Sequence, residues 1–152
     1  MPEISRIARK NGLTVIEDAA HALGAEYKYK NKWYKIGSCR HSSMTVFSFH
    51  PVKHITTGEG GAITTNNSKV YRKLLSLRTH GMYKDKSTAK KGAWYYEMRD
   101  LGFNYRITDF QCALGLSQFR KLDKFIKKRK KIADMYGKAL KDNEYFDLPS
   151  GN

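Results

Sequence analysis

The sequence predicts an α/β domain, because a helical pattern, a tight turn and a buried-strand pattern follow one another near its start. Residues 3–10 place their apolar side chains on one face, and Asn11-Gly12 supplies a C-terminal stop. The apolar run 13–16 then ends in Glu17-Asp18, which is typical of a buried strand with carboxylates at its carboxyl end. Two further strand patterns, at 43–49 and 62–65, extend the expected sheet.

The segments between and after these strands have patterns of their own. Residues 26–36 alternate around Lys30-Asn31-Lys32 and predict an exposed hairpin that Gly37 closes. Pro51 ends the second strand, and the glycine-rich turn 57–61 precedes the third. Asn67 or Ser68 can cap a helix that Gly81 stops.

The second half of the chain predicts a loop and then a long helical stretch. Residues 83–92 are polar and without periodicity, so we expect a loop, and the aromatic patch 94–96 after it favours packing or a subunit contact. Residues 108–111 resemble a capping box at the start of the helical stretch, with a break near Leu122. The part from Lys121 to Lys141 is strongly basic, and we interpret it as a solvated, lysine-rich helix face.

Composition limits the classes of protein to consider. The chain has 152 residues, the length of one domain, and a formal charge of +15, which points towards anionic partners. Its 40% hydrophobic content argues against general disorder. No apolar run is long enough to cross a membrane, and the N-terminus does not resemble a secretory signal. Cys39 and Cys112 match no zinc spacing, so we expect reduced thiols in a cytoplasmic protein.

Polar side chains follow two of the predicted strands at the point where each strand ends. Asp18 and His21 come after the first strand, and Ser48 and Lys53 end or follow the second. Ligands of open α/β sheets collect at the carboxyl ends of strands, so these groups could converge on one small anionic cofactor. His50 and His54 have a metal-ligand spacing, but Pro51 lies between them and no third ligand is near, so we expect no metal.

Three motifs carry a resemblance to a known family. VIEDAAHALGAEY, TVFSFHPVKHITTGEGGAITT and LGFNYRITDFQCALGLSQFRKLD resemble, in this order, the signatures of the DegT-type (DnrJ/StrS) sugar aminotransferases. The resemblance implies pyridoxal 5′-phosphate as cofactor and part of a fold-type I large domain, which is aspartate-aminotransferase-like with three α/β/α layers. Residues 1–121 would be the central part of that domain, and 122–152 a helix leading towards a truncated C-terminal small domain.

The same resemblance implies roles for five residues. Lys53 would bond the cofactor aldehyde, Asp18 would pair with the pyridinium nitrogen, and His21 would lie against the ring. Ser48 would bind the cofactor phosphate, and Asn104 would reach the phosphate in a neighbouring subunit. Each residue also has an ordinary structural interpretation: a solvated lysine, a turn-capping carboxylate, a buried histidine, a strand hydroxyl and a turn-capping amide.

The segments KIGSCRHSSMTVFSFHPVKHITTGEGG and WYYEMRDLGFNYRITD resemble the family members that act in pseudaminic acid biosynthesis. This implies amination of a UDP-linked 4-keto-6-deoxy-N-acetylhexosamine, with L-glutamate as amino donor, by a homodimer with shared sites. We expect this chain to be a truncated or split form. Two alternatives stay open: a basic protein that binds nucleic acid or another polyanion through the helix from Lys121 to Lys141, and a non-catalytic pseudoenzyme that acts as a dimer partner.

Overall fold

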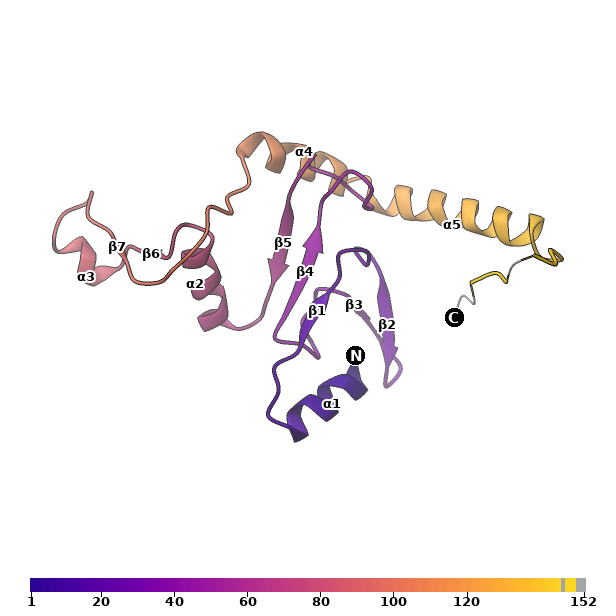
Figure 1. The fold of residues 1–152 in the computed structure, drawn as a ribbon, viewed down its shortest axis with the longest axis horizontal. Coiled ribbons are helices and arrows are strands. Elements are labelled where there is room, and N and C mark those ends of the chain that lie inside the picture. The colour runs from indigo at the N-terminus through magenta and orange to yellow at the C-terminus, as the bar shows by residue number, and fades with distance from the viewer. Residues whose placement is uncertain (146, 150–152) are drawn as a thin grey trace.

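The computed structural model describes residues 1–145 and 147–149, and it has a mixed α/β architecture (Figure 1). Its elements, in chain order, are α1 (Pro2–Lys10), β1 (Ile16–Asp18), β2 (Glu26–Tyr29), β3 (Lys32–Lys35), β4 (Met44–Ser48), β5 (Gly61–Thr64), α2 (Ser68–Leu77), β6 (Met82–Tyr83), α3 (Lys86–Ala89), β7 (Glu97–Met98), α4 (Asp109–Phe119) and α5 (Leu122–Ala139). None of the helices among these residues is long and apolar enough to cross a membrane.

The central sheet has three strands in the order β1-β4-β5. β1 and β4 are parallel, with Asp18 opposite Val46, whereas β5 runs antiparallel to β4, with Gly61 opposite Ser48. The parallel pair brings the carboxyl ends of β1 and β4 to the same end of the sheet. The polar residues that the sequence places after these two strands therefore share one end.

The predicted strand that ends in Glu17-Asp18 is confirmed at its carboxyl end, where β1 covers Ile16–Asp18, but it is wrong at its start, because residues 13–15 are not part of it. Leu13 instead completes the end of α1: its N–H donates to the Ala8 carbonyl at 2.8 Å, while Gly12 has a φ of +64°. This is the hydrogen-bonding pattern of a helix end with a left-handed glycine, which uses the first apolar residue to close the helix. Leu13 is consequently 64% exposed.

The hairpin prediction is confirmed. β2 and β3 pair antiparallel from Glu26–Lys35 to Tyr29–Lys32, and the two turn residues Lys30 and Asn31 have φ values of +45° and +61°. Positive φ at both central positions is the backbone of a tight hairpin turn, for which asparagine is well suited.

The helix starts follow the expected capping chemistry. Asn67, rather than Ser68, caps α2 and accepts from the backbone N–H groups of Lys69 and Val70. Thr108 and Gln111 form the predicted capping box of α4, and the expected break lies between Phe119 and Leu122. The predicted loop 83–92 is wrong in one place, because it contains the short helix α3. Asp85 caps this helix through a capping box with Thr88.

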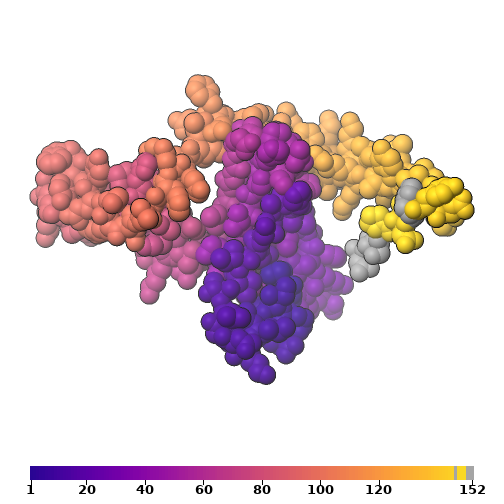
Figure 2. All heavy atoms as spheres, in the orientation of Figure 1, coloured from indigo at the N-terminus to yellow at the C-terminus, as the bar shows by residue number. Residues whose placement is uncertain are grey.

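The molecule is extended (Figures 1 and 2). The sheet lies in the middle, the part with α3, β6 and β7 projects to one side, and α5 projects to the other. Among the described residues, no helix makes more than marginal contact with the strands of the central sheet. The buried apolar core is correspondingly small and consists of Ala8, Ala19, Cys39, Phe47, Ile55 and Leu122.

The accessible surface reflects this shape. It amounts to 12204 Å² for a chain of 17.5 kDa, whereas a compact monomer of that mass exposes roughly 7,900 Å². Large apolar side chains account for part of the excess, since Trp94, Leu101 and Phe110 are 76%, 90% and 91% exposed.

Candidate functional site

The candidate site lies at the carboxyl end of the parallel strands. Pairing continues one residue beyond β1, because the Ala19 N–H donates to the Val46 carbonyl at 2.8 Å. Asp18 ends β1, and its Oδ1 accepts from the Ala20 N–H at 3.1 Å, so the carboxylate also caps the turn that leads to His21. Ser48 ends β4, and its Oγ accepts from the His50 N–H at 3.3 Å.

Lys53 and His21 meet at this end of the sheet. The Lys53 Nζ atom lies 2.6 Å from the His21 Nε2 atom, which is hydrogen-bond distance. A protonated amine has no acceptor lone pair, so this contact requires a neutral imidazole that accepts from it, or an imidazole N–H that donates to a neutral amine. In either form, one proton is shared in the contact between the two side chains.

The Lys53 loop, residues 50–60, is held by backbone hydrogen bonds at its base. Phe49 donates to the Gly60 carbonyl at 2.8 Å and accepts at its own carbonyl from the Thr57 N–H at 3.0 Å. Inside the loop, the Lys53 N–H donates to the His50 carbonyl at 3.0 Å. Thr57 is only 3% exposed, and its hydroxyl donates to the Glu59 carbonyl at 2.8 Å. These contacts fix the path of the backbone that carries Lys53.

Arg129 is a site residue that the sequence analysis did not single out. Its Nη2 atom donates to the Lys53 carbonyl at 3.2 Å, although the two residues are 76 positions apart and Arg129 lies in α5. No local motif marks this contact, and the neighbouring lysines make Arg129 look like one more residue of a solvated face. α4 also reaches the loop, since the Gln111 Nε2 atom donates to the Glu59 carbonyl at 2.9 Å.

His54 adds a further imidazole beside Lys53. Its Nδ1 atom is buried and has no hydrogen-bond partner among the described residues. Burial lowers the pKa of His54, and the positive charges of Arg129, His21 and Lys53 lower it further. Three basic groups, Arg129, His21 and Lys53, thus lie near His54, and such a grouping suits an anionic ligand.

Asn104, expected at the cofactor of a neighbouring subunit, and His50, for which no metal role was expected, both have contacts away from the Lys53 amine. Asn104 pairs with Thr79 in an isolated β-bridge, its Oδ1 accepts from Arg106 Nε at 2.8 Å, and no described contact joins it to Lys53. His50 lies with its Nε2 atom 3.9 Å from Glu59 Oε1. Within the described part of the chain, no group of three or more metal-ligating side chains comes together.

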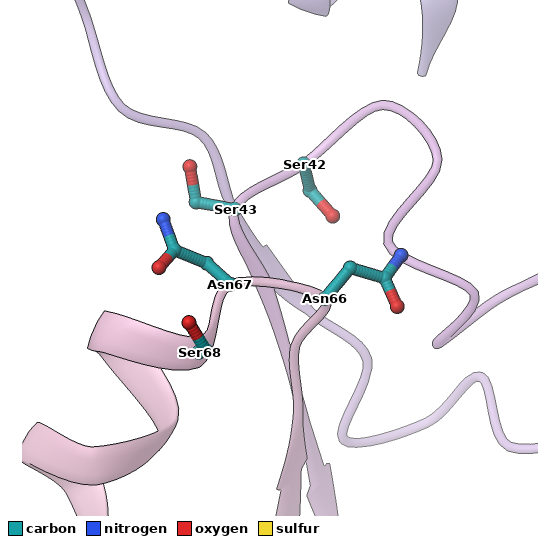
Figure 3. A pocket seen from close by; sticks show the side chains of 5 residues that line it. All are labelled: Ser42, Ser43, Asn66, Asn67 and Ser68. Carbon is teal, nitrogen blue, oxygen red and sulfur yellow. The ribbon is translucent and has the colours of Figure 1, made fainter.

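Two hollows lie at the other end of the sheet. One, of ≈ 490 Å³, is lined by the polar side chains of Ser42, Ser43, Asn66, Asn67 and Ser68 (Figure 3). The other, of ≈ 620 Å³, lies between α1, the β2–β3 hairpin and residues 40–41. Both are next to the start of β4, whereas Lys53 follows its end. Lys53, which is half-buried, therefore lines neither hollow.

Comparison with known proteins gives a consistent result. The model of the DegT/DnrJ/EryC1/StrS aminotransferase family matches residues 1–151. A UDP-4-amino-4,6-dideoxy-N-acetyl-beta-L-altrosamine transaminase of Campylobacter jejuni is 46% identical over 146 residues, covering 96% of this chain and 36% of the relative. The chain thus spans about a third of the length of the curated relatives that it matches.

Solved structures agree in fold. Helicobacter pylori PseC, an aminotransferase involved in the biosynthesis of pseudoaminic acid, superimposes with a TM-score of 0.79 at 38% identity, over 94% of this chain and 35% of that one. The PLP form of the putative sugar aminotransferase Spr1654 from Streptococcus pneumoniae gives a TM-score of 0.75 at 29% identity, over 92% of this chain and 34% of that one. The α/β fold class and the fold-type I relationship expected from the sequence are confirmed.

Proposed function

The chain belongs to the DegT/DnrJ/EryC1/StrS aminotransferase family, and from this premise we propose that Lys53 is its attachment point for pyridoxal 5′-phosphate. The contact between Lys53 Nζ and His21 Nε2, at 2.6 Å, is the observation that carries the proposal. It brings an amine and a proton-accepting imidazole together at the end of a parallel strand pair, where ligands of such sheets bind.

The residues present fit an anionic aldehyde cofactor. When bound, pyridoxal phosphate supplies a reactive aldehyde and a ring that accepts electrons. Lys53 offers the amine that bonds the aldehyde, and His21 takes up the proton that this amine must lose to act as a nucleophile. Asp18, at the end of β1, offers a negative charge for a protonated ring nitrogen, and Ser48 offers a hydroxyl for the phosphate.

The positive charge around Lys53 has two uses in this proposal. The side chain of Arg129 contacts the backbone of Lys53, so two cationic residues lie together and attract an approaching phosphate before the amine reacts. The Arg129 contact also ties the backbone carbonyl of Lys53 to α5 at 3.2 Å. An amine on a fixed backbone has fewer orientations to lose when it forms a bond, which favours attachment.

The relatives suggest the rest of the reaction. We propose that the activity is transamination of a UDP-linked 4-keto-6-deoxy-N-acetylhexosamine, with L-glutamate as amino donor, in a pathway of the pseudaminic acid type. Two free cysteines, Cys39 and Cys112, agree with a cytoplasmic location.

We also propose that the complete active site forms in a homodimer, with Asn104 directed to the cofactor phosphate of the second subunit. The exposed aromatic side chains on the same part of the chain support this, since Trp94, Phe103 and Tyr105 are 76%, 54% and 73% exposed. Exposed apolar groups gathered on one projecting part of a molecule are typical of an interaction surface.

Covalent trapping tests the role of Lys53. The full chain is mixed with pyridoxal phosphate, reduced with borohydride, digested and analysed by mass spectrometry for the labelled peptide. We expect a visible absorption band before reduction and a label on Lys53 afterwards. The Lys53→Ala variant should lose both, whereas Lys128→Ala, a matched change of an exposed lysine one position before Arg129, should keep both.

Three outcomes would contradict the proposal. A label spread equally over Lys53 and other lysines would show that the site does not select the cofactor. A chain that is folded by circular dichroism but unlabelled would favour a non-catalytic partner. Salt-dependent binding to DNA that Lys53→Ala does not change, without labelling, would favour polyanion binding through α5.

A further inference from the structure

The hollow between α1, the β2–β3 hairpin and residues 40–41 is lined by an unusual number of cationic side chains. We call it the basic hollow and define it by Arg6, Arg9, Lys30, Lys32 and Arg40. Its volume is ≈ 620 Å³, and Glu3 is the carboxylate that lines it. That volume lies in the range of sites that hold small molecules, which is about 300–1,000 Å³.

Most of this positive charge is without a counterion. Glu3 Oε2 lies 3.2 Å from Arg6 Nη2 and neutralises one guanidinium. Within the described residues, the side chains of Arg9, Lys32 and Arg40 form no ion pair and no hydrogen bond, and Lys30 only lies over the ring of Tyr29. Cationic groups that share one concave surface repel one another, and a bound anion relieves that repulsion.

The uncharged wall of the hollow is well ordered. The ring of His41 packs edge-on against Tyr29, with centroids 5.1 Å apart, and against Tyr34, with centroids 5.9 Å apart. Its Nδ1 atom also lies 2.6 Å from the Tyr27 hydroxyl. A wall held by these contacts does not need to be rearranged when a ligand binds, which lowers the cost of binding.

The electrostatics of His41 agree with a positive field in the hollow. Burial lowers the pKa of His41, and the charges of Arg40, the chain's amino group and Arg9 lower it further. The imidazole therefore adds no charge at neutral pH, and its Nδ1 atom is engaged by the Tyr27 hydroxyl.

The basic hollow is separate from the Lys53 site. Its residues come from α1, from the hairpin and from the segment before β4, whereas Lys53 follows β4. Figure 1 shows α1 beside the hairpin, at the opposite end of β4 from the start of α5. No residue of the basic hollow takes part in the proposed attachment of the cofactor.

We propose that the basic hollow binds a small phosphorylated molecule, with Arg9 and Arg40 as its principal phosphate contacts. Guanidinium groups match the geometry of phosphate oxygens and can donate two hydrogen bonds at once. The lysines at the hairpin turn add charge, and the tyrosine hydroxyls add neutral donors. A hollow of this size fits a small ligand better than a polynucleotide, which needs an extended basic track.

Calorimetric titration with inorganic pyrophosphate tests this site in the full chain. We expect one pyrophosphate per chain and, in the Arg9→Gln/Arg40→Gln variant, an affinity at least about tenfold lower, because two charge-assisted contacts are lost. The Lys127→Gln/Lys128→Gln variant loses the same charge from the exposed face of α5 and should keep its affinity within about twofold. Neither Arg9 nor Arg40 has a described side-chain partner, so their replacement removes no structural contact.

A second measurement locates the ligand. In nuclear magnetic resonance spectra, the ring signals of His41 should shift on titration with pyrophosphate, while those of His54 stay unchanged. An equal loss of affinity in both double variants would overturn the proposal, because it would show a general charge effect. An oligonucleotide that displaces pyrophosphate and binds more tightly than it would overturn the proposal in favour of a polynucleotide surface. Labelling of Lys53 is measured separately, so failure at one site does not imply failure at the other.

Discussion

The backbone of the Lys53 loop makes a strong prediction at Gly60. This residue has a φ of +155°, and a Cβ atom placed there would lie 2.4 Å from Thr57 Oγ1 and 3.1 Å from Ile107 Cδ1. The Thr57 hydroxyl cannot move freely, because it donates to the Glu59 carbonyl at 2.8 Å in a side chain that is 3% exposed. In Gly60→Ala, the new methyl group must therefore break this hydrogen bond or displace the loop.

The expected cost follows from these two effects. A side chain at such a φ costs about 1–3 kcal/mol, and the loss of one buried hydrogen bond adds about 0.5–1.5 kcal/mol. Gly60→Ala should thus destabilise the closed loop by about 2–4 kcal/mol. Gly58→Ala is the matched control: Gly58 has a φ of +80°, but a Cβ atom there meets nothing within 4 Å. Gly58→Ala should destabilise the closed loop by about 1 kcal/mol, which is the strain of a left-handed backbone alone.

Hydrogen exchange of the Phe49 amide measures loop closure directly, because this N–H donates to the Gly60 carbonyl at 2.8 Å. The Gly60→Ala variant should exchange this amide at least about fivefold faster than Gly58→Ala, because the two costs differ by about 1–3 kcal/mol and every 1.4 kcal/mol corresponds to a factor of ten. It should also trap less pyridoxal phosphate on Lys53. Equal exchange rates in the two variants would refute the reasoning, because they would show that contact between Gly60 and Thr57 does not hold the loop.

Two further predictions concern other parts of the chain. Asn67→Ala should destabilise α2 by about 1 kcal/mol, since the Asn67 side chain accepts from two backbone N–H groups. Urea denaturation followed by circular dichroism measures this loss. Asn67→Asp, which keeps an acceptor, is the control and should retain most of the stability. The pKa of Glu97 is lowered to about 2 by hydrogen bonds from Lys91, Arg99 and Tyr95. A lowered pKa in the folded state means that the stabilisation is present above the ordinary pKa of 4.5 and is lost as the pH falls towards 2. Tryptophan fluorescence of the part with β6 and β7 should therefore change over that range, and Glu97→Gln should remove this pH dependence; an unchanged acid transition in Glu97→Gln would contradict the assignment.

Local hydrogen-bonding chemistry made some elements predictable from the sequence. Asn67 and Thr108 mark helix starts because each side chain satisfies backbone N–H groups that lie two or three residues away. Lys30 and Asn31 mark the hairpin turn for a similarly local reason. Leu13 shows the limit of such patterns: its apolar character fits a strand, yet its N–H closes α1. Apolar runs do not reveal which backbone groups a preceding helix still has to satisfy.

Only part of the candidate site was predictable from the sequence. Lys53 and His21 follow adjacent parallel strands, so the topology that the sequence implies brings them together. Arg129 could not be found in this way, because its contact with Lys53 depends on the direction of α5 across the loop. That direction is set by apolar contacts along the helix, where Leu122 is buried and the side chain of Ile126 lies close to Gly24. The interpretation of the whole basic segment as a solvated face therefore missed one cation that has a structural partner.

The small core makes ligand binding important for the stability of the Lys53 site. α4 and α5 are tied to the loop by two polar contacts, Gln111 to Glu59 and Arg129 to Lys53, rather than by an extensive apolar interface. Single hydrogen bonds of this kind contribute only about 0.5–1.5 kcal/mol each. A cofactor bonded to Lys53 would bring negative charge near Arg129, and a ligand present at 100 times its dissociation constant contributes about 2.7 kcal/mol to the folded state. We therefore expect the site to be assembled in part by its cofactor, with α5 held against the loop most firmly when the positive charge around Lys53 is neutralised.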